Sequence, residues 1–358
     1  MASSLKNPNV FIGPRQGAAL NAFLKKNKYS SIFIICDSNT LKHCLSPLVL
    51  SCISLKEAEV IELEPGEDSK HIEVLGSIWQ TLTDFGADKK SLIINLGGGV
   101  VSDIGGFAAS TYKRGIDYIN IPTTLLAIAD ASVGGKTGIN FSGIKNLLGT
   151  ITQPKAVFVD ALFLKTLPTR HIINGFAEII KIALVQDKKF FTAISHLKIN
   201  SNYNNAAVIK KAISLKTGVI KKDPNEKSLR KILNFGHTIG HAVESLFLEK
   251  EYSLLHGEAI AIGMIVESYL CLTLKRITKT EFNLIHKSLA VNFKFYKIPA
   301  EDLARFVEYL SQDKKNINKT YLFALLKGIG KCDPQVKVSR AQTGKALAYY
   351  NSKIANAS

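Results

Sequence analysis

The sequence has no long apolar segment and no paired cysteine motif. Its longest apolar runs, at 32–36 and 92–96, have the length of buried strands and fall far short of the roughly 20 residues that a helix needs to cross a bilayer. The first residues contain no apolar signal region. The five cysteines form no C-x-x-C pair, which fits reduced thiols in a reducing compartment. We therefore expect a cytoplasmic protein without a membrane partner.

Acidic residues are scarce, so the charge is unbalanced. There are 46 lysines and arginines against 29 acidic residues, which gives a formal net charge of +17. Such an excess suggests nucleic acid as a partner. The basic residues, however, are spread along the whole chain and form no dense tract with interleaved aromatic residues. We therefore favour a basic surface without a nucleic-acid partner. A positive field of this kind also attracts anionic, phosphorylated substrates.

Short apolar runs separated by glycine and proline fill the first half of the chain. Most of these runs lack polar alternation, so we expect buried strands of a parallel sheet, with helices such as 71–85 between them. After Pro168 apolar residues recur at helical spacing. We predict an α/β domain over 1–167 and a helical domain over 168–358. The predicted strands are 10–12, 32–36, 60–63, 92–96, 118–121 and 157–159.

Three glycines, Gly97 to Gly99, directly follow the predicted strand 92–96 and precede a plausible helix. Glycine lets the backbone approach a pyrophosphate, and a helix N-terminus offers amide donors to it. Asp103 lies in the first turn of this helix, where the helix dipole also favours a purely structural carboxylate. The G-x-G-x-x-G fingerprint is incomplete, because Ser102 occupies its last position. The motif alone leaves a tight turn and a nucleotide site equally open.

The segment before Lys136 resembles a P-loop only superficially. Asp130 stands where that motif requires its first glycine, which argues against an NTPase. What remains is a glycine-rich loop that offers Lys136, followed by a second glycine-bounded loop with Lys145 and Asn146. Loop lysines are usually only solvated, but several polar residues within apolar, glycine-rich sequence indicate a binding site.

Histidines and one glutamate in the second half indicate a metal site. His237 and His241 are spaced i, i+4, so on a helix they share one face, as metal ligands often do. His256 follows, and Glu178 lies upstream on an apolar helix. Each of these residues, taken alone, has a purely structural explanation. Glu178, for example, can pair with Lys181 at i, i+3. Together they favour a site for zinc, and two histidines with one carboxylate would leave positions open for substrate.

Several of these motifs together resemble the signatures of the 3-dehydroquinate synthase family. They occur in the family's order and extend from Asp37 to Lys315, nearly the whole chain. The glycine-rich loop is shared with the glycerol-dehydrogenase-like superfamily and so supports only the fold and the cofactor. The matching blocks are 97–107, 112–115, 121–126, 130–137, 145–146, 175–178, 234–241 and 256–258.

The resemblance implies an N-terminal NAD-binding α/β domain, an all-α C-terminal domain that binds zinc and substrate, and a homodimer. Cobalt is an alternative metal. The implied metal ligands are Glu178, His237 and His256, which leaves His241 free, a choice that the i, i+4 spacing could not make. The positions that match cofactor contacts are Asp37, Asn39, Glu67, Lys70, Gly98, Gly99, Val100, Asp103, Thr123, Thr124, Lys136, Lys145 and Thr166.

The substrate implied is a small phosphorylated sugar acid, 3-deoxy-D-arabino-heptulosonate 7-phosphate. The family converts it to 3-dehydroquinate and phosphate by transient oxidation with NAD, elimination of phosphate, reduction and intramolecular aldol closure, a lyase step of the shikimate pathway. His241, Lys136, Asp130, Lys216 and Asn234 match catalytic positions. The positions that match substrate contacts are Arg114, Asp130, Lys136, Asn146, Lys216, Arg230, Asn234, His241 and one of Lys314 and Lys315.

Two departures and three alternatives accompany this interpretation. Residues 223–226 read Asp-Pro-Asn-Glu where such families often carry Asp-Glu-Arg-Glu, and Ser102 replaces a common glycine.

Another sugar-phosphate cyclase is one alternative, although Arg114, Asn146 and Arg230 favour a carboxylate-bearing substrate. A glycerol-dehydrogenase-like alcohol dehydrogenase is the second. A non-catalytic nucleotide- or nucleic-acid-binding protein is the third, and it leaves the histidines and glutamate unexplained.

Overall fold

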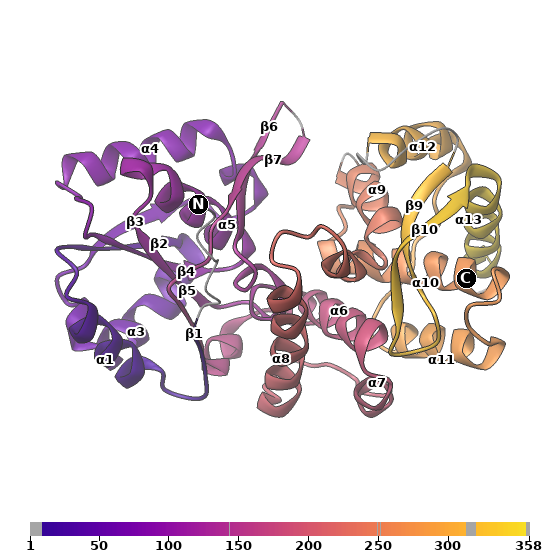
Figure 1. The fold of residues 1–358 in the computed structure, drawn as a ribbon, viewed down its shortest axis with the longest axis horizontal. Coiled ribbons are helices and arrows are strands. Elements are labelled where there is room, and N and C mark those ends of the chain that lie inside the picture. The colour runs from indigo at the N-terminus through magenta and orange to yellow at the C-terminus, as the bar shows by residue number, and fades with distance from the viewer. Residues whose placement is uncertain (1–8, 143, 249, 251, 313–319, 356–358) are drawn as a thin grey trace. The chain divides into compact units, whose positions relative to one another are not determined.

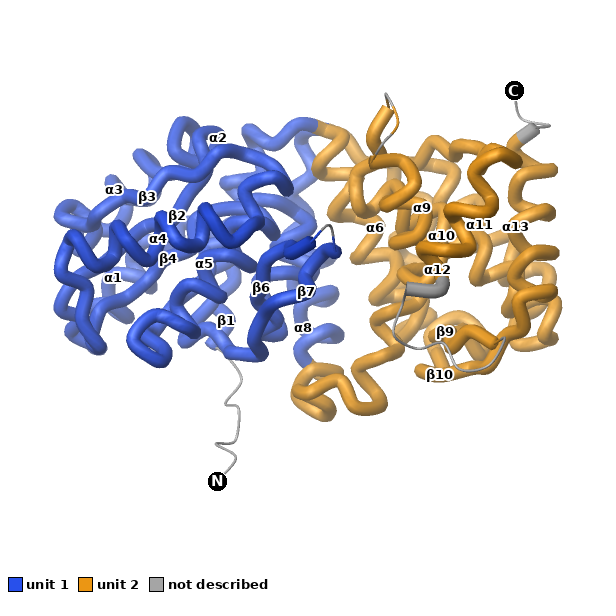
Figure 2. The backbone as a smooth tube through the Cα atoms, turned by 90° about the horizontal axis from the view of Figure 1, so that it is seen from above, with its two compact units in different colours: residues 1–168, 201–217 blue, residues 169–200, 218–358 orange. Residues whose placement is uncertain are grey.

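The computed structural model describes residues 9–142, 144–248, 250, 252–312 and 320–355. The chain divides into two compact units (Figure 2). Unit 1 contains residues 1–168 and 201–217, and unit 2 contains residues 169–200 and 218–358. The return of 201–217 to unit 1 was not part of the division expected from sequence. No helix in the described part of the chain is long and apolar enough to cross a membrane.

Unit 1 is built on a parallel sheet in the order β1-β8-β5-β4-β2-β3 (Figure 1). The central strand β4 is buried along its whole length, as expected for an apolar run without alternation. All six strands predicted in the first half are present. Their bounds are Asn9–Ile12 for β1, Ile32–Asp37 for β2, Glu59–Leu63 for β3, Leu92–Gly97 for β4, Asp117–Pro122 for β5 and Ala156–Val159 for β8.

Helices cover both faces of this sheet (Figure 1). On one face α4 (Ile72–Asp84) and α5 (Gly99–Thr111) pack against side chains such as Phe33 and Ile93. On the other, α1 (Gly17–Asn27) and α3 (Ser46–Ser51) pack against the alternate side chains, such as Ile34 and Ile94. Each fully buried side chain of this size contributes roughly 1.5–3 kcal/mol to the stability of the fold, so the two cores hold the helices firmly against the sheet.

The chain leaves the neighbouring strands β2 and β4 in opposite directions. From β2 it passes through α3 to the edge strand β3, whereas from β4 it passes through α5, on the other face, to β5. In open α/β sheets such a reversal leaves a crevice at the carboxyl ends of the two strands, and ligands bind there. Asp37 ends β2 and Gly97 ends β4, so the sheet puts them at this edge.

Shorter elements complete unit 1. An antiparallel hairpin of β6 (Lys136–Phe141) and β7 (Ile144–Ile151) packs on α5 and was not predicted. The remaining short helices are α2 (Ser38–Thr40), η1 (Leu41–Leu45), η2 (Ile53–Leu55), η3 (Glu67–Ser69), η4 (Tyr112–Arg114), η5 (Ala127–Ala131) and η6 (Ala161–Thr166).

Unit 2 is mainly helical, as predicted, but it also contains an antiparallel hairpin of β9 (Thr320–Leu326) and β10 (Cys332–Ser339). A short apolar run such as β9 cannot be distinguished from a buried helical segment by periodicity. Helix α8 (Ala206–Lys222) belongs partly to each unit. The other helices are α6 (Thr169–Gln186), α7 (Lys188–Ile194), η7 (Leu229–Asn234), α9 (His237–Leu248), α10 (His256–Thr273), α11 (Lys279–Ala290), η8 (Ala300–Asp302), α12 (Leu303–Gln312) and α13 (Arg340–Ala355).

Helices α9 and α10 cross very closely, because glycines line the crossing. A Cβ atom added to Gly263 would lie 1.9 Å from the Gly236 carbonyl oxygen. A Cβ atom added to Gly240 would lie 2.6 Å from the Cδ1 atom of Ile260. Only glycine allows backbones to approach in this way. The crossing brings the first residues of the two helices, His237 and His256, close together.

Candidate functional site

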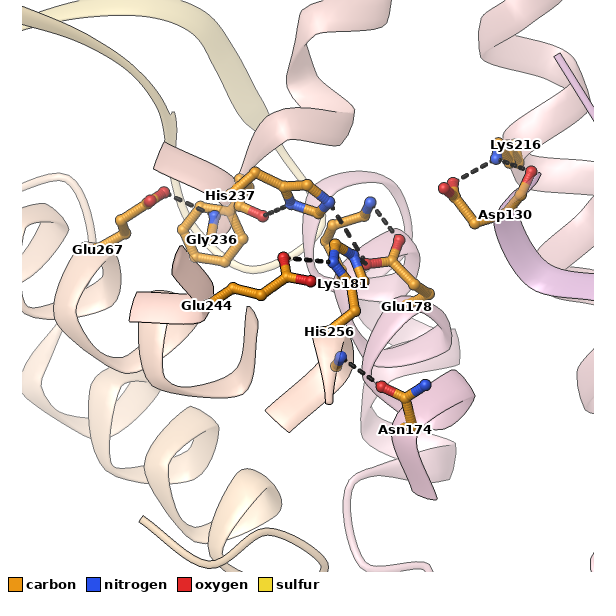
Figure 3. A network of polar contacts seen from close by, with 12 residues as sticks. Asp130, Asn174, Glu178, Lys181, Lys216, Gly236, His237, Glu244, His256 and Glu267 are labelled. Carbon is orange, nitrogen blue, oxygen red and sulfur yellow. Dashed lines mark hydrogen bonds and ion pairs between the residues drawn. The ribbon is translucent and has the colours of Figure 1, made fainter. Parts of the chain in front are cut away.

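The three predicted metal ligands converge in unit 2 (Figure 3). Glu178 lies on α6, His237 begins α9 and His256 begins α10, and their ligand atoms all lie within 4.8 Å of one another. The Nε2 atoms of His237 and His256 are 3.5 Å and 3.7 Å from Oε1 of Glu178. Two imidazoles and one carboxylate that converge from three helices fit zinc and leave coordination positions for another ligand.

The outer nitrogen of each histidine is held by a hydrogen-bond acceptor. Nδ1 of His237 is 3.2 Å from the Phe235 carbonyl oxygen, and Nδ1 of His256 is 3.2 Å from Oε2 of Glu244. With a proton on Nδ1 in each of these hydrogen bonds, Nε2, the nitrogen nearest to Glu178, would be available to a metal ion. Metal-binding histidines are normally anchored in this way through the nitrogen that does not bind the ion.

Two carboxylates, those of Glu178 and Glu244, lie next to the His256 ring. Glu178 is fully buried and forms an ion pair with Lys181, as its i, i+3 spacing predicted. Burial lowers the pKa of His256, but the charges and hydrogen bonds of Glu244 and Glu178 outweigh it and raise that pKa to about 10. The carboxylates thus favour a positive charge at this position, and a divalent cation would supply it while the histidines stay neutral.

His241 lies beside the ligand cluster and is not part of the group formed by Glu178, His237 and His256. Its ring centroid is 5.1 Å from that of His237 and 5.9 Å from that of His256, and its side chain is exposed. It forms a second group with Glu244 and His256 in which the ligand atoms lie within 4.8 Å of one another. Its position suits an exchange of protons with a substrate or with water.

In unit 1, three predicted cofactor residues form one polar network. Nζ of Lys70, which is buried, lies 2.6 Å from Oδ2 of Asp103 and 3.8 Å from Oε1 of Glu67. Burial raises the pKa of Asp103, and the charge of Lys70 acts in the opposite direction. The network joins the loop after β3 to the first turns of α5, so it lies at the carboxyl edge of the sheet.

Asn140 extends this network into the β6–β7 hairpin, and the sequence analysis missed it. Its side-chain amide donates to Oε1 of Glu67 at 2.9 Å, and its backbone N–H donates to the Lys70 carbonyl oxygen at 2.7 Å. Its Oδ1 atom accepts from the backbone N–H of Asn146 at 2.9 Å. The hairpin thereby links Asn146, a predicted substrate residue, to the cofactor network. Asn140 has no sequence signal besides its place between Lys136 and Asn146.

The glycine run forms the tight connection from β4 to α5 that its sequence predicted. Gly98 is the N-cap of α5, and a Cβ atom added there would lie 3.2 Å from the side chain of Thr124. Thr123 donates its backbone N–H to the Gly97 carbonyl oxygen at 3.0 Å. The first amides of α5, from Gly99 and Val100 onward, have no acceptor within the helix, which suits a pyrophosphate.

Ser102 breaks the glycine fingerprint without harm to this turn. Its buried hydroxyl donates to the Gly98 carbonyl oxygen at 3.0 Å. The third glycine of the fingerprint normally allows a helix to pack closely on a strand. Here Gly105 has that role, because a Cβ atom added to it would lie 1.9 Å from Oδ1 of Asn95 on β4.

The remaining cofactor candidates occupy ends of other elements. Asp37 caps α2, and its Oδ1 atom accepts the backbone N–H of Thr40 at 2.8 Å. Asn39 in α2 and Lys145 in β7 are not buried, and Thr166 ends η6 after β8.

Two groups of predicted substrate residues come together. In unit 1 the buried Lys216 of α8 donates to both the carboxylate and the backbone carbonyl of Asp130 (Figure 3). In unit 2, Asn234 donates to Oε1 of Glu226 at 2.9 Å, and Nε of Arg230 lies 4.0 Å from Oε2 of the same residue. Lys136 begins β6 and has an exposed side chain.

The departure at 223–226 leaves the loop well anchored. Asp223 accepts the backbone N–H groups of Lys227, Ser228 and Arg230 at 2.8 to 2.9 Å. The carbonyl oxygen of Pro224 accepts from the Arg230 guanidinium at 2.8 Å. The two residues that hold the loop, Asp223 and Glu226, are the ones that match the common family pattern.

Arg114, by contrast, is not brought to the other substrate candidates of unit 1. It lies in η4, beyond the C-terminal end of α5, and the 13 residues of that helix separate it by about 20 Å from the glycine turn. Its side chain is exposed and its φ is 60°. Lys314 and Lys315 lie outside the described residues.

Comparisons with known proteins agree with this fold. Residues 60–174 match the family model "3-dehydroquinate synthase N-terminal", and residues 175–316 match "3-dehydroquinate synthase C-terminal". The 3-dehydroquinate synthase of Parabacteroides distasonis is 38% identical over 338 residues, which are 94% of this chain and 95% of that one.

Solved structures with the same fold include 2-epi-5-epi-valiolone synthase from Streptomyces hygroscopicus, with NAD+ and Zn2+ bound. It is 28% identical with a TM-score of 0.84, and the match covers 99% of both chains. A probable glycerol dehydrogenase from Sinorhizobium meliloti shares the fold at 14% identity and a TM-score of 0.62, again over 99% of both chains. The fold is therefore that of the dehydroquinate synthase-like and glycerol-dehydrogenase-like superfamily. Within it, the chain belongs to the 3-dehydroquinate synthase family, which confirms the resemblance seen in the sequence.

Proposed function

We propose that this chain is a 3-dehydroquinate synthase that uses NAD and zinc, with cobalt as a possible substitute. It converts 3-deoxy-D-arabino-heptulosonate 7-phosphate to 3-dehydroquinate and phosphate, as a phosphate-eliminating lyase of the shikimate pathway that works in the cytoplasm as a homodimer. The observation that carries the proposal is the convergence of Glu178, His237 and His256 in a chain of this family.

Unit 1 has the groups that a dinucleotide needs. NAD would supply the hydride acceptor and, after the elimination, the hydride donor. The amides at the start of α5 would bind the pyrophosphate, and the close approach at Gly98 gives it access to the backbone. Asp37 at the end of β2 would accept hydrogen bonds from ribose hydroxyls, and Lys70 with Asp103 would fix the loop beside them.

Unit 2 has the groups that a metal ion needs. Zinc held by Glu178, His237 and His256 would supply Lewis acidity toward the hydroxyl oxygen whose carbon is oxidised. His241, next to these ligands, would take up and return protons at the substrate.

The basic and amide side chains near these groups suit a substrate with a phosphate and a carboxylate. Arginine binds both groups with paired hydrogen bonds, and lysine binds them as a point charge. We assign Arg230 and Asn234 in unit 2, and Lys136, Asn146 and Lys216 in unit 1, to these contacts.

The test is to incubate the protein with this substrate, NAD and zinc, and to follow phosphate, NADH and the organic product together. One phosphate per substrate and 3-dehydroquinate, without accumulation of NADH, are expected because the hydride returns to the substrate. Accumulation of one NADH per substrate consumed would contradict the proposal and favour the glycerol-dehydrogenase-like alternative.

A second candidate function is that of another sugar-phosphate cyclase. The similarity to 2-epi-5-epi-valiolone synthase over 99% of both chains favours it. The two functions differ in the substrate's carboxylate, so a seven-carbon sugar phosphate without a carboxylate separates them. Turnover of that compound in preference to the sugar acid would replace the first proposal with the second.

A further inference from the structure

We propose that Glu244 is a positioning residue of the metal centre, which fixes the orientation of the His256 ring and thereby sets the metal affinity. This inference rests on the proposed metal site. Glu244 is not one of the three expected ligands, and no family signature in the sequence pointed to it as a functional residue.

Glu244 lies on the same face of α9 as two histidines of the site. His237, His241 and Glu244 are spaced i, i+4 and i+7, which is two turns of one helical face. That face is directed at the start of α10, since the ring of His256 contacts both histidines. The carboxylate of Glu244 reaches Nδ1 of His256 at 3.2 Å (Figure 3).

The contact decides which atom of His256 faces Glu178. A rotation of the imidazole ring by 180° puts a carbon atom in the place of Nδ1 and a second carbon atom in the place of Nε2. Only the observed orientation satisfies Glu244 through Nδ1 and directs Nε2 toward Glu178. A carboxylate acceptor also keeps the proton on Nδ1, so that Nε2 retains the lone pair that a metal ion needs.

The two histidine ligands differ in how they are held. Nδ1 of His237 faces a backbone carbonyl, that of Phe235, which the fold itself positions. Nδ1 of His256 faces a side chain, and that side chain is only 12% exposed. Because the carboxylate is largely removed from water, its hydrogen bond to the imidazole is stronger than at the surface. His256 is therefore the ligand whose orientation a single substitution can release.

The experiment measures zinc affinity by competition with a chromophoric chelator on the full chain, for the wild type, Glu244→Ala and Glu244→Gln. We expect Glu244→Ala to weaken binding by about 10- to 100-fold, the usual effect of removing a partner of a metal-bound histidine. Glu244→Gln keeps an acceptor for Nδ1 and should lie between the alanine variant and the wild type. One zinc per chain should still bind at saturation. Glu308→Gln, an exposed glutamate of α12, is the control for a lost charge.

The cobalt-substituted protein distinguishes positioning from ligation. If Glu244 only positions His256, the visible spectrum of cobalt-saturated Glu244→Gln should match that of the wild type. A changed spectrum, or loss of the metal as complete as in His256→Ala, would overturn the inference and make Glu244 a ligand. Zinc affinity of Glu244→Ala equal to the wild type's would also overturn it. Neither readout depends on turnover, so a failure of the proposed activity would show separately in the phosphate assay.

Discussion

Two histidines one helical turn apart have different surroundings, and on this difference we base different proposed roles for them. The side chain of His237 is only 12% exposed and its Nε2 atom faces Glu178 at 3.5 Å, whereas the side chain of His241 is exposed. Sequence spacing alone makes both histidines equally good ligands. The structure shows Glu178 grouped with His237 and His256, and His241 grouped instead with Glu244 and His256.

We therefore predict that His241→Ala lowers the turnover rate by about 100-fold or more, the usual effect of losing an acid–base group, while zinc stays near one per chain. His237→Ala should lose zinc as well as activity. Because both substitutions lie on α9, each controls for general damage to the helix. Elemental analysis of folded protein, measured beside the rate, distinguishes them. Loss of zinc from His241→Ala would show that His241 is a ligand, and the assignment of His256 as a ligand would then need a new test.

Two residues of the site that the sequence analysis missed, Asn140 and Glu244, contact residues that were predicted. Asn140 holds the loop of Glu67 and Lys70 through both its side chain and its backbone. Glu244 supports His256 across two helices. Neither contact could be predicted, because each joins segments whose proximity only the fold creates. The spacing of Glu244 from His237, i, i+7, was the one available signal.

At the scale of elements, the parallel sheet was predictable and the two hairpins were not. Most sheet strands are apolar runs bounded by glycine, proline or a polar residue, and burial on both faces, as in β4, removes the need for alternation. The strand β7 has a mixed pattern of exposed and half-buried residues instead. The strand β9 follows residues 313–319 and is a buried run of seven that could equally have been helical. Apolar runs therefore sufficed to predict the strands of the sheet, including the partly exposed β1 and β3, and did not suffice for the two hairpins.

The close crossing of α9 and α10 depends on glycine, which leads to a prediction. In Gly263→Ala the new Cβ atom would lie 1.9 Å from the Gly236 carbonyl oxygen, so the helices must separate. Overpacking of this kind costs about 1–3 kcal/mol. We expect a lower thermal midpoint and weaker zinc binding, because the separation moves His237 away from His256.

Gly76→Ala is the matched control, since Gly76 also lies within a helix, α4, but an added Cβ atom would meet nothing within 4 Å. That variant should be as stable as the wild type or more stable by up to about 1 kcal/mol, because alanine favours the helix. Thermal unfolding and chelator competition measure both effects. Equal behaviour of the two variants would show that the crossing tolerates the added methyl group.

At the scale of the whole molecule, the predicted cofactor and metal residues fall into different compact units. All thirteen cofactor candidates, from Asp37 to Thr166, belong to unit 1. Glu178, His237 and His256 belong to unit 2. The glycine-rich turn and the metal ligands are thus built from separate hydrophobic cores. We therefore predict that each site forms without the other's ligand.

Removal of the metal should therefore stop turnover without preventing the binding of NAD. Chelation is expected to abolish phosphate release, because His256 then takes up a proton between Glu178 and Glu244 and the Lewis acid is lost. NAD affinity, measured by calorimetry, should remain nearly unchanged. The thermal midpoint of the zinc-bound protein should exceed that of the metal-free protein, since a ligand at one hundred times its dissociation constant stabilises by about 2.7 kcal/mol.

Restoration provides the control for this prediction. Zinc or cobalt should return both the activity and the higher midpoint, because two imidazoles and one carboxylate suit these ions. Magnesium, which prefers oxygen ligands and near-octahedral geometry, should return neither. Full activity in a preparation shown to be metal-free would contradict the role of the Glu178 cluster. Loss of NAD binding on chelation would show instead that the two units depend on each other's ligands, against the independence that their separate cores predict.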